Sequence, residues 1–538
     1  MEMRKVVVLG TCLAALVACE SGDIVLQPTN VDNSTDNRAV NSGGGSDGNP
    51  CASYTDPATN SLEQGSFDGT NCTYGASFVS FENSLQVDLS IPFITGVHVF
   101  EETLAVGTEV APGEGAAPAD GEGPTLTIAP GSTLAFSDPA DYVLISRGSR
   151  IEANGSPSAP ITFTGFSDAV TGTAGPEDVQ LWGGVVINGN GITNNCTDAQ
   201  RASDDCHVQS EGPPSYYGGD DNGESSGTLR YVIVKHTGFE VVSGDELNGV
   251  TFNAVGSGTV VENLEVYSTY DDGIEMFGGA VSISNLLAVY VRDDSIDFSD
   301  GWVGSVTNAL VIHSQTDGNR CIEGDNIGAG RANLGVPLDT APVTNPMISN
   351  LTCIMSSHDA GTHDPSEGIV LRLGPRAQFM DSVIFGAYAD DVGENNRCFE
   401  LVDDVTRNFA QGGETTMTNS LIVCEDATKG SLQNGDDIGE WVLGANPSTN
   451  GANYSFNTGN VIVEAADLVA DADINVLDCY YTASMLTDDA GAQIDIVPAS
   501  GQLGAVTRDD DWTAPWGYGL RADNRGQALW FAPGNGCP

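Results

Sequence analysis

The pattern of apolar and polar residues changes near residue 125. From there on, short β-branched runs alternate with Gly, Asn and Asp, and apolar residues rarely recur at helical spacing. Runs of this kind, bounded by turn residues, are typical of strands. The pattern predicts an all-β domain over residues 125–445, with further coils and a cap over 446–538.

A repeat of 22 residues runs through the middle of this domain. Asn263 recurs as Asn285, and the segment 271–276 (DDGIEM) recurs as 293–298 (DDSIDF). Asn308 follows Asn285 after 23 residues. A fixed period of about 20 to 50 residues indicates a solenoid, and a coil of this length holds a strand and its two neighbours. The repeat therefore predicts a right-handed parallel β-helix whose stacked coils share one core.

Two other architectures fit the repeat less well. A β-propeller would repeat about every 40 residues, and a β-sandwich would turn about every dozen residues. Weaker copies of the repeat occur at residues 182–187 and 367–371, and both begin a β-branched run. The parallel β-helix is therefore the fold that we expect.

The N-terminus has the features of an export signal. Residues 1–5 contain Arg and Lys, an apolar run follows to Ala18, and Leu16-Val17-Ala18-Cys19 resembles the lipobox of bacterial lipoproteins. The resemblance implies that Cys19 is acylated and anchors the chain in a lipid bilayer of the cell envelope, with the outer membrane expected, on its periplasmic or its outer side. An ordinary signal peptide that contains a cysteine is the alternative.

The segments between this signal and the β domain differ in composition. We expect residues 1–18 to form the signal peptide and residues 19–50, which are rich in Asn, Ser, Asp and Gly, to form a flexible tether. Residues 51–124 are expected to form an N-terminal capping region with an acidic loop. No later stretch is apolar enough to cross a bilayer.

Ten cysteines remain besides Cys12 and Cys19, and an even number in an exported chain predicts disulfides. No two of them have the Cys-x-x-Cys spacing of a zinc ribbon or a thioredoxin-like pair. Arg320-Cys321 is echoed by Arg397-Cys398, and each is followed by another cysteine in a β-rich run. The echo and the proximity of the others suggest the pairs Cys51–Cys72, Cys196–Cys206, Cys321–Cys353, Cys398–Cys424 and Cys479–Cys537.

The chain is strongly acidic. It has 74 acidic and 19 basic residues, a formal net charge of -55, and its only lysines are Lys5, Lys235 and Lys429. Such a charge excludes nucleic acid as a partner. It fits either a protein adapted to salty surroundings or one that collects cations, and composition alone leaves both open.

Several motifs resemble one family of exported bacterial parallel β-helix proteins with a pectate-lyase-like superfold. Its members are lipoproteins or secreted surface proteins of unassigned activity, so the resemblance implies a fold and a location but no catalytic residue. The polygalacturonases are less similar, because their Gly-His-Gly and Arg-x-Lys motifs are missing here. The matching motifs are residues 126–132, 151–156, 160–164, 182–184, 217–219, 257–259, 271–279 and 510–513.

Repetition places like carboxylates on successive coils. Adjacent coils lie about 4.8 Å apart, and two charges about 5 Å apart repel by roughly 0.8 kcal/mol in water and about four times as much at an effective dielectric of 20. Calcium bound between coils would relieve this repulsion. Solvated carboxylates, or carboxylates that accept turn hydrogen bonds, are the alternative. The predicted ligands are Asp271, Asp272, Glu275, Asp293, Asp294 and Asp297, with Asp300, Asp317, Glu323 and Asp325 as residues that could complete the site.

Other polar clusters carry weaker expectations. His358-Asp359 and His363-Asp364 could hold a metal, but their loop-like setting favours exposed polar residues. The similar segments 390–394 and 436–440 are expected to be turns. His236 is expected to be a solvent-facing strand residue and not a general base.

Two functions from different classes fit these features. The first is a surface module that binds calcium and, with it, a glycan or another surface protein. The second is a carbohydrate-active enzyme, either a glycosidase with two carboxylates such as Asp272 and Asp294, or a polysaccharide lyase with Arg292, Arg320 or Lys235 as its basic residues. An aromatic-lined groove beside the carboxylates would favour the enzyme, and a flat acidic ladder would favour the binding module.

Overall fold

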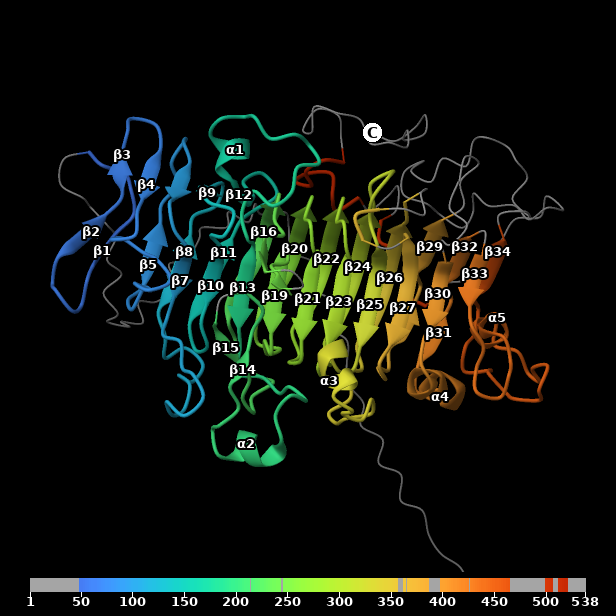
Figure 1. Cartoon of the computed structure of the whole chain (residues 1–538). Helices are drawn as coiled ribbons and strands as arrows, with labels where there is room; N and C mark the ends of the chain where they lie inside the picture. Colours follow the sequence, from blue (N-terminus) through green and yellow to red (C-terminus); the bar gives the residue numbers. More distant parts are fainter. Residues whose placement is uncertain are drawn as a thin grey trace, which may run out of the picture. The chain divides into compact units, whose positions relative to one another are not determined.

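Parallel strands form most of the computed structural model (Figure 1). It describes residues 48–464, 499–506 and 511–520, except 213, 243–244, 357–360, 364, 387–396 and 425. These residues belong to one of the two units into which the chain divides, residues 43–538. The predicted signal peptide, Cys19, nearly all of the tether and the expected Cys479–Cys537 pair lie outside the described residues.

One parallel sheet has ten strands, each from a different coil. Every neighbouring pair in this sheet is parallel, with Ile274 beside Ile296 as an example of the register. Its strands, in spatial order, are β7 (Leu104–Val106), β10 (Val143–Ile145), β13 (Val185–Asn188), β19 (Val250–Asn253), β21 (Ile274–Phe277), β23 (Ile296–Ser299), β25 (Arg320–Asp325), β27 (Glu367–Arg372), β30 (Arg397–Leu401) and β33 (Asp426–Lys429).

The second large sheet has eighteen strands. In the middle coils one long strand spans its full width, whereas in the outer coils two shorter strands do so, as β11 and β12 both pair with β16. Its strands are β3 (Ser66–Phe67), β4 (Cys72–Tyr74), β5 (Leu89–Ile91), β6 (His98–Phe100), β8 (Thr125–Ile128), β9 (Thr133–Phe136), β11 (Arg150–Asn154), β12 (Ile161–Gly165), β16 (Gly227–Lys235), β20 (Val260–Tyr267), β22 (Ser282–Val289), β24 (Ser305–Ile312), β26 (Met347–Ile354), β28 (Gln378–Met380), β29 (Val383–Gly386), β31 (Thr416–Thr418), β32 (Leu421–Cys424) and β34 (Val461–Glu464).

A ladder of asparagines bends this second sheet. Asn263, Asn285 and Asn308 have φ values of 57°, 59° and 58°, a left-handed conformation that asparagine tolerates better than most residues. The side-chain amide of Asn285 donates to Asn263 (3.1 Å), and that of Asn308 donates to Asn285 (3.0 Å). The bend turns the wide sheet into two faces, so that each coil has three sides.

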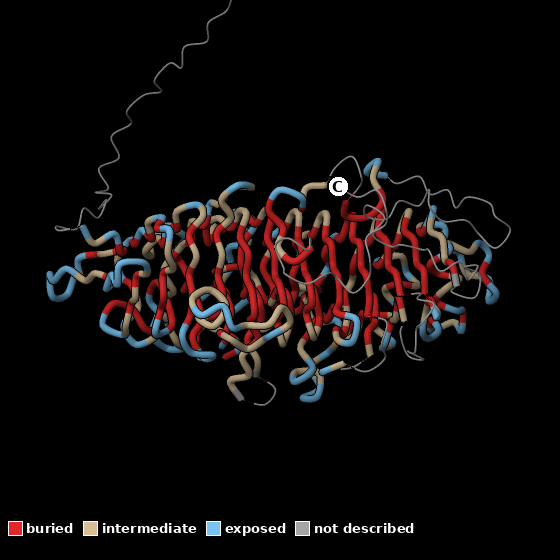
Figure 2. Tube along the Cα trace, turned by 90° about the horizontal axis from the view of Figure 1, so that it is seen from above, coloured by how far each residue is buried: buried red, intermediate tan, exposed pale blue. Residues whose placement is uncertain are grey.

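The apolar positions of the repeat form one continuous core. Ile274, Met276, Ile296 and Phe298 are completely buried, and their alternation along the strand turns the residues between them outward. Figure 2 shows the buried positions running along the whole stack of coils. The observed register, with its steps of 22 and 23 residues at the asparagines, confirms the predicted parallel β-helix.

Parallel pairing extends on both sides of the expected range of 125–445. It begins where β4 pairs with β6, and it still occurs where β32 pairs with β34. Four of the expected disulfides are confirmed: Cys51–Cys72, Cys196–Cys206, Cys321–Cys353 and Cys398–Cys424. The last two connect the ten-stranded sheet with the eighteen-stranded sheet across the core.

Outside the two large sheets there are short antiparallel strand pairs and short helices. Antiparallel pairs are formed by β1 (Ser53–Thr55) with β2 (Leu62–Gln64), β14 (Val208–Gln209) with β15 (Tyr216–Tyr217), and β17 (Glu240–Val242) with β18 (Asp245–Glu246). The helices are α1 (Phe166–Ala169), α2 (Asp198–Ala202), α3 (Ala329–Asn333), α4 (Asp404–Gly412) and α5 (Ile438–Val442). In the described part of the chain, no helix has the length and apolar character needed to cross a membrane.

Replacing Asn285 by alanine tests the ladder. The substitution removes two side-chain hydrogen bonds and places alanine at a positive φ, so we expect the free energy of unfolding to fall by about 2–3 kcal/mol. Urea denaturation followed by circular dichroism measures the change. Ser284→Ala, on the same strand, is the control and should cost less than about 0.5 kcal/mol. Equal losses in both variants would show that the ladder contributes nothing specific.

Candidate functional site

The predicted carboxylates meet on the outer surface of the ten-stranded sheet. Because Ile274 and Met276 point into the core, Glu275 between them points outward. The register places Glu275 beside Asp297, and Asp297 beside Glu323. Three successive strands, β21, β23 and β25, therefore carry one row of carboxylates (Figure 1).

A second row lies in the turns that precede these strands. The backbone N–H of Asp294 donates to Asp272 Oδ1 (3.0 Å), and the backbone N–H of Arg320 donates to Asp294 Oδ1 (2.9 Å). The backbone N–H of Asp272 donates in turn to the side chain of Asn248 (3.2 Å). Asp272 and Asp294 thus lie on neighbouring coils, as the repeat predicts. They accept turn hydrogen bonds, but they are buried, with exposures of 6% and 3%, and are not solvated.

The two rows line a cleft of about 560 Å³, which we call the acidic cleft. Nine carboxylates face it, against two arginines, one histidine and one asparagine. In the part of the chain that the structure describes, no tyrosine, tryptophan or phenylalanine lines this cleft. Its lining residues are Glu211, Glu246, Asp271, Asp272, Glu275, Asp293, Asp294, Asp297, Asn319, Arg320, Glu323, His363 and Arg372.

Three groups of carboxylates in the acidic cleft have the spacing of metal ligands. Within each group the oxygens lie within 4.8 Å of one another. Since calcium takes six to eight oxygens at about 2.3–2.6 Å, three carboxylates at this spacing can share one ion. The first group is Asp271, Asp272 and Asp293, the middle group is Asp272, Glu275 and Asp297, and the third group is Asp294, Asp297 and Glu323.

Burial and mutual repulsion oppose ionisation of these carboxylates. Burial, followed by neighbouring carboxylates, raises the pKa of Asp272, Glu275 and Asp297 well above the usual range. Burial also raises the pKa of Asp294 to about 8 and that of Glu323 to about 7. A nearby cation would reverse this tendency, because it favours the charged form.

The cations of the cleft are gathered at one end. Arg320 lies 2.6 Å from Glu323 and 3.4 Å from Asp294, and Arg372 also contacts Glu323. Among the described residues, no lysine or arginine nitrogen lies within 4.0 Å of the carboxylates of Asp271, Asp272, Glu275 or Asp297. Among the described residues, Asp271, Asp272, Glu275 and Asp297 therefore have no lysine or arginine beside them, whereas Asp293 of the first group lies 3.1 Å from His363.

Several residues of the cleft were missed by sequence reasoning. Glu211 and Glu246 come from the hairpins around β14 and β18, which interrupt the repeat, so nothing in the repeat pattern points to them. Arg372 directly follows the weak copy of the repeat at 367–371, and Asn248 lies 24 residues before Asp272. The repeat pattern could therefore have pointed to both residues. His363 Nδ1 lies 3.1 Å from Asp293, although we expected an exposed polar residue there.

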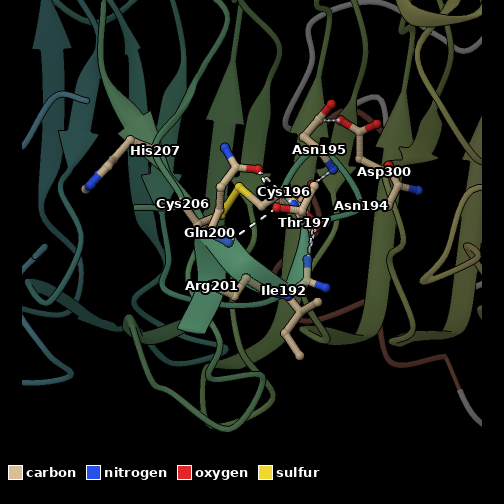
Figure 3. The surroundings of a disulfide bond; sticks show 12 residues. Ile192, Asn194, Asn195, Cys196, Thr197, Gln200, Arg201, Cys206, His207 and Asp300 are labelled. Atoms are coloured by element: carbon tan, nitrogen blue, oxygen red, sulfur yellow. Dashed lines mark hydrogen bonds between the residues drawn. A yellow bond between two sulfur atoms is a disulfide. The ribbon is translucent and has the colours of Figure 1, made fainter. Parts of the chain in front are cut away.

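Two of the residues expected to complete the site lie elsewhere. Asp300 accepts a hydrogen bond from Asn195, next to the Cys196–Cys206 disulfide (Figure 3). Arg331 lies 3.2 Å from the other oxygen of Asp300. Asp317 does not continue the row of Asp272 and Asp294, because the third coil is longer. Arg320 takes the place beside Asp294, and Asp317 lies 3.6 Å from Arg292.

Glu323 does join the cleft, and Asp325 binds Arg372 beside it (3.1 Å). Among the basic candidates for catalysis, Arg320 lines the cleft, whereas Arg292 and Lys235 do not. Lys235 belongs to β16 of the other large sheet, where it pairs with Asp168 at 2.7 Å.

The expectation for His236 was wrong. Its side chain is 1% exposed, and its Nδ1 bonds to the backbone oxygen of Asp178 (2.6 Å). His236 follows β16 with a positive φ of 62°, and the segment that contains Asp168 and Asp178 covers its ring. The segment 436–440 is not the expected turn, because Asp437 caps helix α5, which begins at Ile438, and Asp436 accepts a hydrogen bond from the backbone N–H of Asn450. The similar segment 390–394 and His358-Asp359 lie outside the described residues, as does Asp364.

Comparison with known families bears out the fold. A family model described as a pectate-lyase-like beta helix domain matches residues 119–459, more than half of the chain. The chain belongs to this family. The match covers the strands that carry the acidic cleft, and the family suggests a carbohydrate-related protein. Comparisons with curated proteins and with solved structures found no match.

The raised pKa values predict an unusual pH dependence of stability. Asp294 and Glu323 bind protons more tightly in the folded chain than in the unfolded one, so between about pH 4 and pH 8 the folded state holds more protons. In chelator we expect the free energy of unfolding to rise as the pH falls from 8 to 5, by about 1.4 kcal/mol per pH unit for each such proton. Urea titrations at several pH values measure this slope.

The variant Asp294→Asn/Glu323→Gln supplies the control. It lacks two of the groups that take up protons, so its stability should depend less on pH over the same range. If the native chain instead became less stable on mild acidification, these carboxylates would be ionised and already compensated in the fold.

Proposed function

We propose that the chain is a cell-envelope lipoprotein that binds calcium in its acidic cleft and, through the ion, an acidic glycan at the cell surface. The observation that carries this proposal is the gathering of nine carboxylates in one cleft, in which the middle group of Asp272, Glu275 and Asp297 has no lysine or arginine within 4.0 Å among the described residues. The anchoring part of the proposal rests on the lipobox-like sequence that ends at Cys19.

Other coils of the same sheet neutralise their carboxylates with basic side chains. Glu400 lies 2.8 Å from Lys429, and Asp426 lies 2.9 Å from Arg397. The sequence therefore can place a cation beside an outward carboxylate, yet β21 and β23 lack one. A divalent cation supplies the missing charge, and carboxylate oxygens are the ligands that calcium prefers.

The difference in burial among the carboxylates favours a ligand that reaches the ion from the solvent side. Asp272 and Glu275 are buried at 6% and 7% exposure, whereas Asp271, Asp293 and Asp297 are only partly buried. An ion held between these two levels keeps a coordination position toward solvent. An anionic glycan can then offer a carboxylate oxygen to the ion, although the acidic surface alone would repel it.

Removing two carboxylates from the cleft tests calcium binding. Asp272→Asn/Asp297→Asn takes away one oxygen ligand on each of two coils, so we expect the calcium affinity to fall at least about tenfold, since ligand charge sets affinity in such sites. Isothermal titration calorimetry on chelator-treated protein measures it.

A matched control removes the same charge elsewhere. Glu152→Gln/Glu262→Gln changes two carboxylates on the eighteen-stranded sheet and should keep the native calcium affinity. If both double variants bound calcium like the native chain, or if the native chain bound none, the acidic cleft would not be a calcium site.

A carbohydrate-active enzyme is the second candidate. Arg320 and Arg372 beside the carboxylates favour a lyase, which needs a base and a group that neutralises the substrate's carboxylate. Among the described residues that line the acidic cleft there is no tyrosine, tryptophan or phenylalanine on which a sugar could stack, and this favours the binding module.

Polysaccharide binding and turnover separate the two functions. We expect the native chain to be retained on an immobilised uronate polymer in calcium and released by chelator, without cleavage of the polymer. A neutral polysaccharide serves as the control and should not retain it. Appearance of unsaturated or reducing sugar ends that Asp272→Asn and Asp294→Asn abolish would establish the enzyme instead.

A further inference from the structure

The third carboxylate group already contacts two guanidinium groups of the protein. Arg320 Nη1 lies 2.6 Å from Glu323 Oε1 and 3.4 Å from Asp294 Oδ2. Arg372 Nη2 contacts the other oxygen of Glu323, and Arg372 Nε lies 3.1 Å from Asp325. Both oxygens of Glu323 are therefore held by guanidinium groups.

Asp297, which belongs to both the middle and the third group, has an unsatisfied oxygen. Its Oδ1 is buried and accepts no hydrogen bond from the described residues. Glu323 Oε1 in the third group accepts none either, but it lies 2.6 Å from Arg320. On the side of Asp272 and Glu275, which lie within 4.8 Å of Asp297, no guanidinium takes this place, so the unsatisfied oxygen indicates a ligand there.

Arg320 occupies the position where the repeat would place a third aspartate. The backbone N–H of Asp294 donates to Asp272, and in the same way the backbone N–H of Arg320 donates to Asp294. The column of buried carboxylates therefore ends in a guanidinium. Its side chain points back over Asp294 and Glu323, which would otherwise continue the row of oxygen ligands.

We infer that Arg320 and Arg372 are fixed cations that close the third group to divalent cations, so that calcium binds at the middle group and not at the third. This inference rests on the proposed calcium function of the cleft. A calcium ion at Glu323 would have to approach two guanidinium groups, and their like charges repel. Without the guanidinium groups, Asp294, Asp297 and Glu323 present the same spacing of oxygens as the other groups.

Counting bound calcium ions tests this role. Calorimetry, together with elemental analysis of the dialysed protein, gives the number of ions per chain. We expect Arg320→Gln/Arg372→Gln to bind one calcium ion more than the native chain. Arg320→Lys/Arg372→Lys keeps both charges and should bind the native number. Arg150→Gln/Arg230→Gln, which removes two arginines paired with Asp120 and Glu262, should also leave the number unchanged.

Single substitutions of the carboxylates keep the test decisive even if the arginine variants do not fold. Asp297→Asn should weaken calcium binding at least about tenfold. Glu323→Gln should change it by less than about twofold, because Glu323 is not a calcium ligand in this account.

The outcomes separate this inference from the proposed function. A native chain that binds no calcium overturns both. A native chain that binds calcium, with no additional ion in Arg320→Gln/Arg372→Gln or with a large loss in Glu323→Gln, overturns only the role of the two arginines.

Discussion

The spacing between stacked strands is the constraint on which the whole structure depends. Each coil of the β-helix repeats its predecessor at about the 4.8 Å separation of paired strands, so any residue that recurs with the period lies beside its own copy. For inward residues such as Ile274 and Ile296 this stacking builds the core. For Asn263 and Asn285 it builds a ladder of amide hydrogen bonds at the bend.

The same spacing is unfavourable for outward carboxylates. Along most of the ten-stranded sheet, basic or apolar side chains lie beside the outward carboxylates, as Lys429 lies beside Glu400. At β21 and β23 the repeat brings carboxylates together without such partners, and burial raises their pKa values. Folded proteins retain buried carboxylates with such raised pKa values chiefly at functional sites. The cost of burying these carboxylates supports the proposal that the acidic cleft binds a cation.

The repeat made the fold, the four described disulfides and the core of the acidic cleft predictable from sequence. The 22-residue repeat predicted that Asp272 lies beside Asp294. The similarity of Arg320-Cys321 to Arg397-Cys398 predicted the two disulfides that cross the core. The prediction failed where the chain leaves the repeat. A longer third coil moved Asp317 out of line, and hairpins brought Glu211 and Glu246 over the cleft. Insertions have no period, so their side chains could not be placed.

A crystal structure of the chain grown with calcium would test the central claim most directly. The account predicts anomalous density for an ion between the first two acidic coils, with oxygens of Asp272, Glu275 and Asp297 at about 2.3–2.6 Å from it. An acidic cleft without an ion at saturating calcium, with its carboxylates hydrogen-bonded to one another as protonated pairs, would contradict it.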